Sequence, residues 1–413
     1  MSKINVYNNW DPLEEIWLGD VWPSHFYDNL EPEVRDNFYY LTECTKEDLA
    51  AIQKKFEEFG VIVRRPHIED DRSKHTITDK SSILLKPPIC PRDDHAVVGN
   101  RLFYDGSQER WWKPILDLYT DQIFSHSKDS SIPDINGANM VKIGRDIIFD
   151  HAGIWEHTDG VGSLQQRKEE VFKRFKSFEE RELVWFGDKH RLHFSTEGGH
   201  LDSCYMPAKE GIVLTTKHVD NYDEILPNWK QIGIRNPSYM AEKEDYQGNA
   251  LFVSKDSQYR KVPTILRTKD FGPFRKWLGN LVGLMDHVPP HFNQYIHEFC
   301  KSWIGNYKET YFEVNVVPID EHNLICVDTS GLFDNLFEEL EKNGITCHTV
   351  PWRSRGFWDG GIHCITLDVR RRSTLKDYFP DRGENGIATV NSSVFSNSTE
   401  IFLKEYNQWK SAQ

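Results

Sequence analysis

The chain has 413 residues, with 50 Lys and Arg against 64 Asp and Glu, so its formal net charge is −14. Apolar residues make up 38% and aromatic residues 13%, which suffices for a large packed core and excludes disorder for the bulk of the chain. The acidic balance argues against a nucleic-acid or anionic membrane partner. No apolar run approaches the roughly 18 residues that a bilayer-spanning helix needs.

The chain contains seven cysteines, an odd number, and none of them forms a C-x-x-C pair. Its start, Met1–Asp11, lacks the apolar core of a secretory signal. We therefore expect a cytoplasmic protein with free thiols, one of which can serve as a nucleophile.

A strand-turn-strand pattern recurs along the chain. Short β-rich apolar runs flank a polar or glycine turn at 96–105, 140–149, 206–214 and 316–326, and a glycine-led strand follows at 360–370. Period-two alternation bounded by Gly, Asn and Asp is typical of β-hairpins. The pattern fits a generic α/β fold, but its regularity favours about five repeated hairpin-plus-helix units that close into a ring around a central site.

Amphipathic helices are predicted between these hairpins. A capping box at Thr45–Asp48 predicts the start of a helix that Gly60 ends, with a strand directly after it. A strongly charged surface helix is predicted over about 163–178, another helix over 332–340, and a short one near 399–410.

One catalytic domain is expected over residues 1–379. Within it, residues from about 225 to 305 are long, mixed and aromatic and fit the repeat poorly, so we interpret them as an insertion. Residues 380–413 are expected to form a C-terminal extension.

Three short segments carry residues suited to chemistry. Cys364 follows the paired glycines of Gly360-Gly-Ile-His-Cys364, which allow a bent backbone and close approach of a substrate. His200 and Asp202 are predicted to share one side of an extended segment, where they could hold a cationic group. Asp93 is expected at the mouth of a strand. Each segment also has an interpretation without function: Cys364 as a buried apolar thiol, His200 as a surface histidine and Asp93 as an ordinary turn carboxylate.

Other candidates are rejected. His190 and His193 lack a recognisable zinc arrangement, as do the three histidines between 287 and 297, and all are interpreted as solvated surface residues. Neither G-x-x-x-x-G-K-[ST] nor G-x-G-x-x-G occurs, so nucleotide binding has no support.

Taken together, five blocks of the chain resemble the guanidino-group-modifying enzymes, and most closely the glycine amidinotransferase family. The long run Cys-x-Thr-x-Asp-Val-Arg-Arg-Arg in the last block is the most specific. In order, the blocks are Asn9–Gly19, Cys90–Asp93 with Val98–Asn100, Ile143–Ile148, His200–Asp202 with Gly211–Leu214, and Gly360–Phe379.

The resemblance implies the pentein fold, a five-bladed α/β propeller of ββαβ modules with pseudo-fivefold symmetry. It implies that Cys364 attacks the guanidinium carbon of an arginine-like donor, while His200 moves the proton of the departing and incoming amines. Asp93 and Asp202 would hold the planar guanidinium, for which carboxylates suit the fork geometry. Neither a metal nor an organic cofactor is expected.

The chain also departs from the family pattern. Asn136 stands where the family places the carboxylate that orients the histidine, and an amide can hold the ring but adds no charge. The family's substrate-binding arginine falls on Val219, and two acids, Glu197 and Glu309, replace neutral residues. With Asn315 they complete the expected substrate site. One arginine lost and two acids gained favour a cationic substrate, such as a diamine or an agmatine-like compound, over glycine.

Three functions remain open on the sequence. The first is an amidinotransferase that uses arginine or an arginine-like donor, an amine acceptor and a covalent amidino-cysteine intermediate. The second is an arginine deiminase-like hydrolase, and the third is a non-catalytic binding protein on the same fold. Small-molecule substrates are the expected partners, without nucleic acid or membrane, and a homodimer is kept open.

Overall fold

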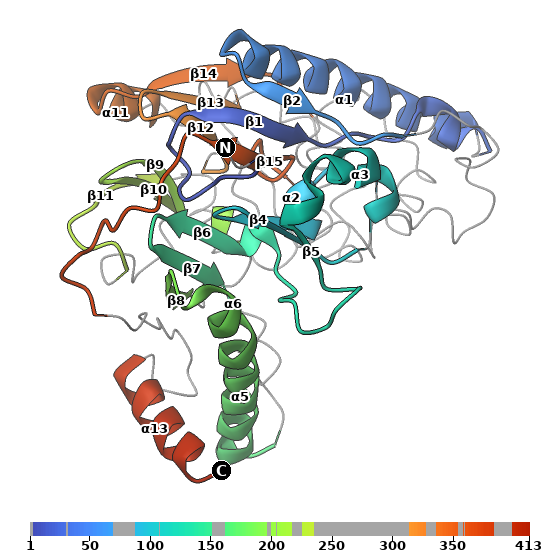
Figure 1. The fold of residues 1–413 in the computed structure, drawn as a ribbon. Helices are drawn as coiled ribbons and strands as arrows, with labels where there is room; N and C mark the ends of the chain where they lie inside the picture. Colours follow the sequence, from blue (N-terminus) through green and yellow to red (C-terminus); the bar gives the residue numbers. More distant parts are fainter. Residues whose placement is uncertain are drawn as a thin grey trace, which may run out of the picture.

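A computed structural model describes most of the chain outside the region 235–313. Its described residues are 3–29, 32–68, 87–106, 108–150, 162–195, 200–203, 205–216, 225–234, 314–327, 336–353, 358, 360–383 and 399–413. Within these ranges the protein has a mixed α/β fold built from small sheets (Figure 1). No helix in the described part is both long and apolar enough to cross a bilayer.

The described residues form five three-stranded sheets with one common pattern. In each, the central strand pairs antiparallel with one neighbour and parallel with the other. With the central strand in the middle, the sheets are β3 (His95–Val98), β4 (Arg101–Tyr104) and β5 (Ile123–Ser125); β6 (Met140–Ile143), β7 (Asp146–Asp150) and β8 (Arg191–Ser195); β9 (Tyr205–Lys209), β10 (Ile212–Thr216) and β11 (Lys230–Ile234); β12 (Val317–Asp320), β13 (Asn323–Val327) and β14 (Thr346–Val350); and β15 (Thr366–Arg371), β1 (Leu13–Leu18) and β2 (Ile62–Arg64).

The four hairpins predicted from the sequence are confirmed. Each joins the first two strands of a sheet, and glycines with positive φ turn the chain at Gly99, Gly144 and Gly211. The fifth strand has no hairpin partner beside it in sequence, because β15 pairs with β1 from the other end of the chain. The described part of the expected insertion, 225–234, contains β11, which pairs with β10.

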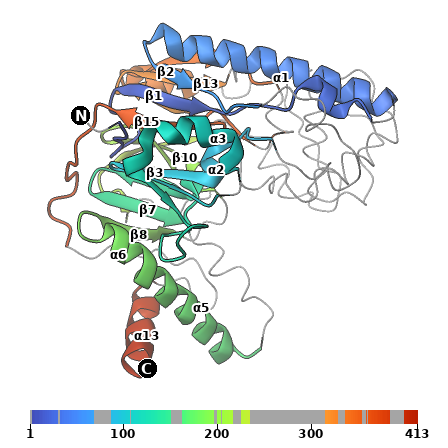
Figure 2. The same cartoon turned by 45° about the vertical axis from the view of Figure 1, so that its right-hand side comes forward.

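Helices connect the strands, and the long α1 (Pro32–Glu58) runs along one edge of the molecule beside β2 and β14 (Figures 1 and 2). The other α-helices are α2 (Pro91–Asp94), α3 (Glu109–Leu116), α5 (Leu164–Phe178), α6 (Val184–Phe186), α11 (Leu336–Lys342) and α13 (Thr399–Ser411). Short 3-10 turns are η1 (Ser24–Tyr27), η3 (Asp117–Gln122), η4 (Gly137–Asn139) and η6 (Leu201–Ser203), and η5 (Glu179–Leu183) is a π-turn.

One predicted helix start is wrong. Helix α1 begins at Pro32, so Thr45 and Asp48 lie in its interior instead of capping it. The Thr45 hydroxyl donates back to the Leu41 carbonyl at 2.7 Å, and Asp48 accepts a hydrogen bond from Arg353 Nε at 2.9 Å. The predicted end is confirmed, since Gly60 has a φ of 75° directly after the helix.

The charged helix α5 and the C-terminal helix α13 lie side by side and project away from the sheets (Figures 1 and 2). The capping box that begins α5 involves Ser163 and Gln166. Phe172 and Phe175 pack on Phe402 of α13, which is fully buried. Aromatic packing against α5 therefore holds α13, the last helix of the chain, in place.

Strands that belong to different sheets contact one another. β15 packs on β3, β6 on β9, β9 on β12, and β12 on β1. The N-terminal segment threads between them, with β-bridges from Val6 to Gly99 and from Asn8 to Ile143. The sheets thus contact each other through strands far apart in sequence.

A buried cluster of charges joins strands β15 and β6 and helix α2. Asp368 of β15 accepts a hydrogen bond from Arg92 Nη2 at 2.8 Å and another from Arg371 Nε at 3.1 Å. Lys142 Nζ of β6 lies 3.7 Å from the same carboxylate, and all four side chains are buried. Burial alone would raise the pKa of the Asp368 carboxyl, but these three cations hold it well below its ordinary value.

The cations of this cluster also bind backbone. Arg92 Nε donates to the carbonyl of His363 at 3.0 Å and of Thr366 at 3.1 Å, at the start of β15. Arg371 Nη2 donates to the Pro318 carbonyl of β12 at 2.9 Å. The cluster consequently fixes the turn before β15 relative to α2 and to the sheet of β12.

Replacing Arg92 tests this role. Arg92→Met leaves the buried Asp368 carboxylate short of a partner, and breaking a buried ion pair from one side costs about 3 to 5 kcal/mol. Urea unfolding should report that loss. Arg372→Met is the control, because the Arg372 side chain is 77% exposed and its contact with Glu14 is worth less than about 1 kcal/mol. If the two substitutions lower the free energy of unfolding equally, the cluster does not stabilise the fold as described.

Candidate active site

Cys364 lies in a tight turn that leads into β15, and its side chain is only 1% exposed. The turn is closed by hydrogen bonds from Ile365 N to the Gly361 carbonyl and from Thr366 N to the His363 carbonyl. A Cβ at residue 361 would lie 2.5 Å from Oδ1 of Asn315, which is closer than real contacts allow. Glycine is required there because the Asn315 amide occupies the space.

Asn315, just before β12, contacts the thiol directly. Its Oδ1 accepts a hydrogen bond from the Cys364 backbone N–H at 3.0 Å, and its Nδ2 lies 3.1 Å from Cys364 Sγ. Nδ2 also lies 3.5 Å from the backbone carbonyl of Asp202. Asn315 is fully buried, so this contact is shielded from solvent.

Asp202, in the turn η6, also contacts the thiol. Its Oδ2 accepts a hydrogen bond from His363 Nδ1 at 2.7 Å and lies 3.6 Å from Cys364 Sγ. Burial would raise the pKa of this carboxyl, but the hydrogen bond from His363 and the nearby charge of Arg92 hold it below its ordinary value. Burial lowers the pKa of His363 to about 4, so the pair consists of a neutral imidazole and a carboxylate.

His200 and Asp93 face each other at the more accessible side. His200 Nδ1 lies 3.9 Å from Asp93 Oδ1, and the two side chains are 19% and 20% exposed. Asp93 comes from helix α2, next to Arg92 of the buried cluster. The structure therefore brings together five sequence-predicted residues: Cys364, His200, Asp202, Asp93 and Asn315.

The predicted backbone around His200 is wrong in one respect. Residues 201–203 form a 3-10 turn instead of an extended segment, closed by a hydrogen bond from Ser203 N to the His200 carbonyl at 3.0 Å. Asp202 is consequently buried while His200 stays partly exposed. The sequence analysis assigns no role to His363, whose contact with Asp202 depends on residues 161 positions apart and leaves no local signal.

The thiol itself is in a setting that disfavours its charged form. Burial raises the pKa of Cys364 well above its ordinary value, and the charges of Asp202, Cys90 and Asp93 raise it further. A cation bound between the two carboxylates would offset this effect. The free site is thus suited to a positively charged ligand.

Asn136 lies at the start of η4, which packs against both α2 and η6. Its Oδ1 accepts a hydrogen bond from Ala138 N at 2.7 Å and so caps this turn. Glu197, Glu309 and Val219, the other positions expected at the substrate site, lie outside the described residues.

The interpretation of His190 and His193 as solvated residues is wrong. His193 is fully buried and its Nε2 lies 2.6 Å from Asp146 Oδ1, while Arg191 Nη2 donates to the other oxygen of this carboxylate at 2.8 Å. His190 is also buried. Among the described residues, no group of three or more His, Cys, Asp or Glu side chains is arranged to hold a metal ion.

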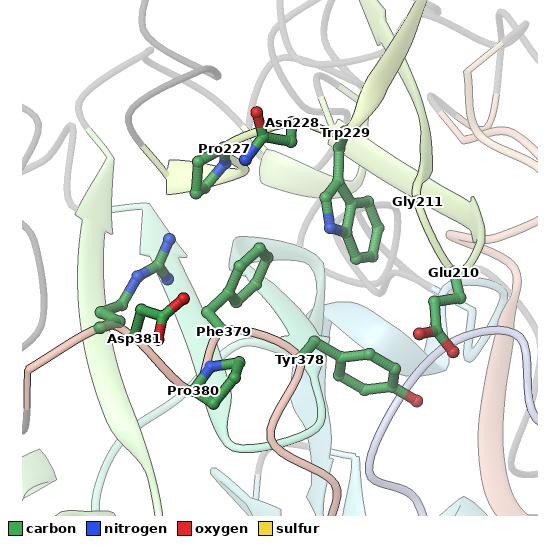
Figure 3. Close-up of a pocket in the computed structure, with 10 residues that line it drawn as sticks. Glu210, Gly211, Pro227, Asn228, Trp229, Tyr378, Phe379, Pro380 and Asp381 are labelled. Atoms are coloured by element: carbon green, nitrogen blue, oxygen red, sulfur yellow. The ribbon is translucent and has the colours of Figure 1, made fainter.

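A surface cavity of about 610 Å³ lies apart from this cluster (Figure 3). Aromatic rings of Trp229, Tyr378 and Phe379 line it, with the carboxylates of Glu210 and Asp381 among them. None of the candidate catalytic residues is among its lining residues.

The chain is similar over nearly its whole length to amidinotransferases. It is 22% identical to inosamine-phosphate amidinotransferase 1 of Streptomyces glaucescens, covering 92% of this chain and 99% of that protein. It is 22% identical to the mitochondrial glycine amidinotransferase of Xenopus laevis, covering 90% of this chain and 84% of that protein. No protein-family model matches the chain.

Solved structures agree on the fold. SxtG, an amidinotransferase from Microseira wollei in the saxitoxin biosynthetic pathway, matches with a TM-score of 0.54 and 18% identity, over 91% of this chain and 99% of that chain. Inosamine-phosphate amidinotransferase StrB1 from Streptomyces griseus matches with a TM-score of 0.53 and 19% identity, over 92% and 99%. The fold is thus shared with enzymes that modify guanidino groups. The curated relatives and the shared fold together support an enzyme of the amidinotransferase family.

The buried histidines predict how stability depends on pH. Burial lowers the pKa of His95, His190 and His363 to about 4. Between about pH 6.5 and 4 the unfolded chain therefore binds protons that the folded chain does not, and the free energy of unfolding falls as the pH is lowered. Each histidine contributes at most about 1.4 kcal/mol per pH unit.

Urea unfolding between about pH 7 and pH 5, where most carboxylates stay ionised, measures this slope. His95→Asn should reduce it, whereas His322→Asn should not, because His322 lies on the surface. An unfolding free energy that does not change over this range would contradict the prediction.

Proposed function

We propose that the protein transfers an amidino group from arginine, or an arginine-like donor, to an amine acceptor through a covalent amidino-Cys364 intermediate. The observation that carries the proposal is a buried carboxylate oxygen, Asp202 Oδ2, at 3.6 Å from the Cys364 thiol. A guanidinium bound to this carboxylate would place its carbon beside the sulfur. Asp93 and His200, on the accessible side, complete an arrangement suited to cation binding and proton transfer.

In the proposed reaction the Cys364 thiolate attacks the guanidinium carbon and forms a C–S bond. His200 gives a proton to the leaving nitrogen as its C–N bond breaks, and an amine departs. The acceptor amine then attacks the amidino carbon, His200 takes a proton from it, and the C–S bond breaks to restore the thiolate. Because both carboxylates raise the thiol pKa in the free site, the cation that they bind also favours formation of the nucleophile.

We propose that the five sheets are the blades of a five-bladed α/β propeller with pseudo-fivefold symmetry, within a single domain over 1–379. Their common strand pattern and the contacts between strands of different sheets support this arrangement. The site residues come from the turns before β3, β9, β12 and β15, as expected for chemistry at the centre of a ring. Residues 380–413 would then be an extension whose helix α13 docks on α5.

Asn136 is proposed to support His200 through position and not through charge. The hydrogen bond to Ala138 N holds η4 between the turns that carry Asp93 and Asp202. A neutral support leaves the histidine pKa lower than a carboxylate would.

A cationic acceptor, such as a diamine or an agmatine-like compound, is proposed on the charge of the substrate positions. Glu197 and Glu309 would attract an ammonium group, and Val219 offers no cation for a carboxylate. Incubation with arginine and a panel of amines tests the acceptor by mass spectrometry. Glycine as the best acceptor would contradict it, and citrulline without transfer would indicate a hydrolase.

The covalent step predicts an adduct on one thiol. Intact mass after quenching with arginine should show one added amidino group in the wild type and none in Cys364→Ser, because the serine hydroxyl is far less nucleophilic. Cys326→Ser is the control and should keep the adduct, since Cys326 is a buried thiol of β13. An adduct that maps to Cys90 or Cys326 would refute the assignment of the nucleophile.

Loss of the proton shuttle predicts a slow but folded enzyme. His200→Ala should lower kcat about 100- to 10,000-fold, the usual contribution of general acid–base catalysis. Asp93→Asn should instead raise the KM for arginine, because a neutral amide does not balance the guanidinium charge. Steady-state rates and circular dichroism separate these effects from unfolding. Wild-type turnover in His200→Ala would exclude the proposed shuttle.

A further inference from the structure

We propose that Asn315 stabilises the Cys364 thiolate, with its amide nitrogen as the hydrogen-bond donor to the reacting sulfur. The inference rests on the proposed nucleophile, but it concerns the free enzyme before any substrate binds. It gives Asn315 a role other than substrate contact.

The hydrogen bonds of Asn315 fix which end of its amide faces the thiol. Oδ1 accepts from the Cys364 backbone N–H at 3.0 Å, which only the oxygen can do. Nδ2 must then point to Cys364 Sγ, at 3.1 Å. A flipped amide would set an N–H against an N–H and an oxygen against the sulfur, so the orientation follows from the network.

Both N–H groups of this amide have a partner within the protein. One donates to Cys364 Sγ, and the other faces the backbone carbonyl of Asp202 at 3.5 Å. Asn315 is fully buried. The amide therefore has no donor left for a substrate, and its nitrogen serves the nucleophile.

The charges around Cys364 oppose formation of its thiolate, and a hydrogen-bond donor to the sulfur offsets them. Burial and the charges of Asp202 and Asp93 all act to raise the thiol pKa. The Asn315 amide is the side-chain N–H that the described structure places against the sulfur. A hydrogen bond strengthens when its acceptor becomes an anion, so this contact favours the thiolate over the thiol.

The fold reserves space for this amide. A Cβ at residue 361 would lie 2.5 Å from Asn315 Oδ1 and 2.6 Å from its Cβ. The paired glycines before the cysteine consequently allow Asn315, from the sheet of β12, to reach the turn before β15. Asn315 therefore links the sheet of β12 to the turn before β15 and also contacts the Cys364 thiol.

The test measures the thiol pKa of the free enzyme. Alkylation of Cys364 by iodoacetamide, followed by mass spectrometry across pH, gives the midpoint of thiolate formation. Loss of a hydrogen bond to a charged group should raise this midpoint by about one to two pH units in Asn315→Ala. Asn315→Asp should raise it further, because a carboxylate oxygen would then face the thiolate.

Asn8→Asp is the matched control. Asn8 is also fully buried, and its Oδ1 likewise accepts from backbone N–H groups, those of Trp10 and Asp11, but its contacts lie at the N-terminal segment. The alkylation midpoint should be unchanged in this variant. If Asn315→Asp fails to fold, Asn315→Ala alone decides the outcome.

A midpoint equal to that of the wild type in a folded Asn315 variant would overturn the inference, even if the arginine adduct forms on Cys364. Absence of that adduct in the wild type would instead overturn the proposed function and leave the measured pKa shift intact. In the active enzyme, the acid limb of kcat/KM should move to higher pH together with the alkylation midpoint. A raised KM for arginine without any pH shift would indicate substrate contact instead.

Discussion

The buried carboxylate of Asp368 sets the main electrostatic constraint on the packing of this protein. Arg92 of α2, Lys142 of β6 and Arg371 of β15 itself surround it. A buried anion without such partners costs several kcal/mol, so this cluster favours the packing that brings α2, β6 and β15 together. Arg92 also binds the carbonyls at the start of β15. The same residues that join the sheets thereby set the position of the turn that carries Cys364, and of Asp93 beside Arg92.

The site built on this frame has an excess of negative charge around a buried thiol. Asp202 stays ionised because His363 and nearby cations stabilise it, and with Asp93 it raises the pKa of Cys364. When it is empty, such a site disfavours the Cys364 thiolate, and a planar cation suits it as the proposed ligand. The Asn315 amide acts in the opposite direction, since its N–H meets the sulfur. Reactivity would then depend on the balance between two carboxylates, one amide and the charge of the substrate.

The long motif that marks the family in the sequence owes much of its specificity to packing. In the run Cys364–Arg372, Asp368 and Arg371 belong to the buried charge cluster, and the Thr366 hydroxyl donates to the Ile362 carbonyl at 2.9 Å. Only Cys364 itself faces Asp202 and Asn315. The motif marks the family as one continuous run, whereas in the structure only its first residue belongs to the candidate site and Asp368 and Arg371 belong to the charge cluster.

Local sequence patterns were enough to predict the hairpins, several helices and the residue types of the candidate site. Turn glycines and period-two alternation specify the hairpins, and the Ser163 capping box specifies the start of α5, because these signals act between residues a few positions apart. These patterns did not determine the start of α1, the turn at 201–203, the burial of His193 or the contact of His363 with Asp202. The burial of His193 and the turn of Asp202 depend on partners distant in sequence, Asp146 for His193 and His363 for Asp202. Local patterns do not contain these features, because burial and long-range charge pairing override local preference once the sheets come together.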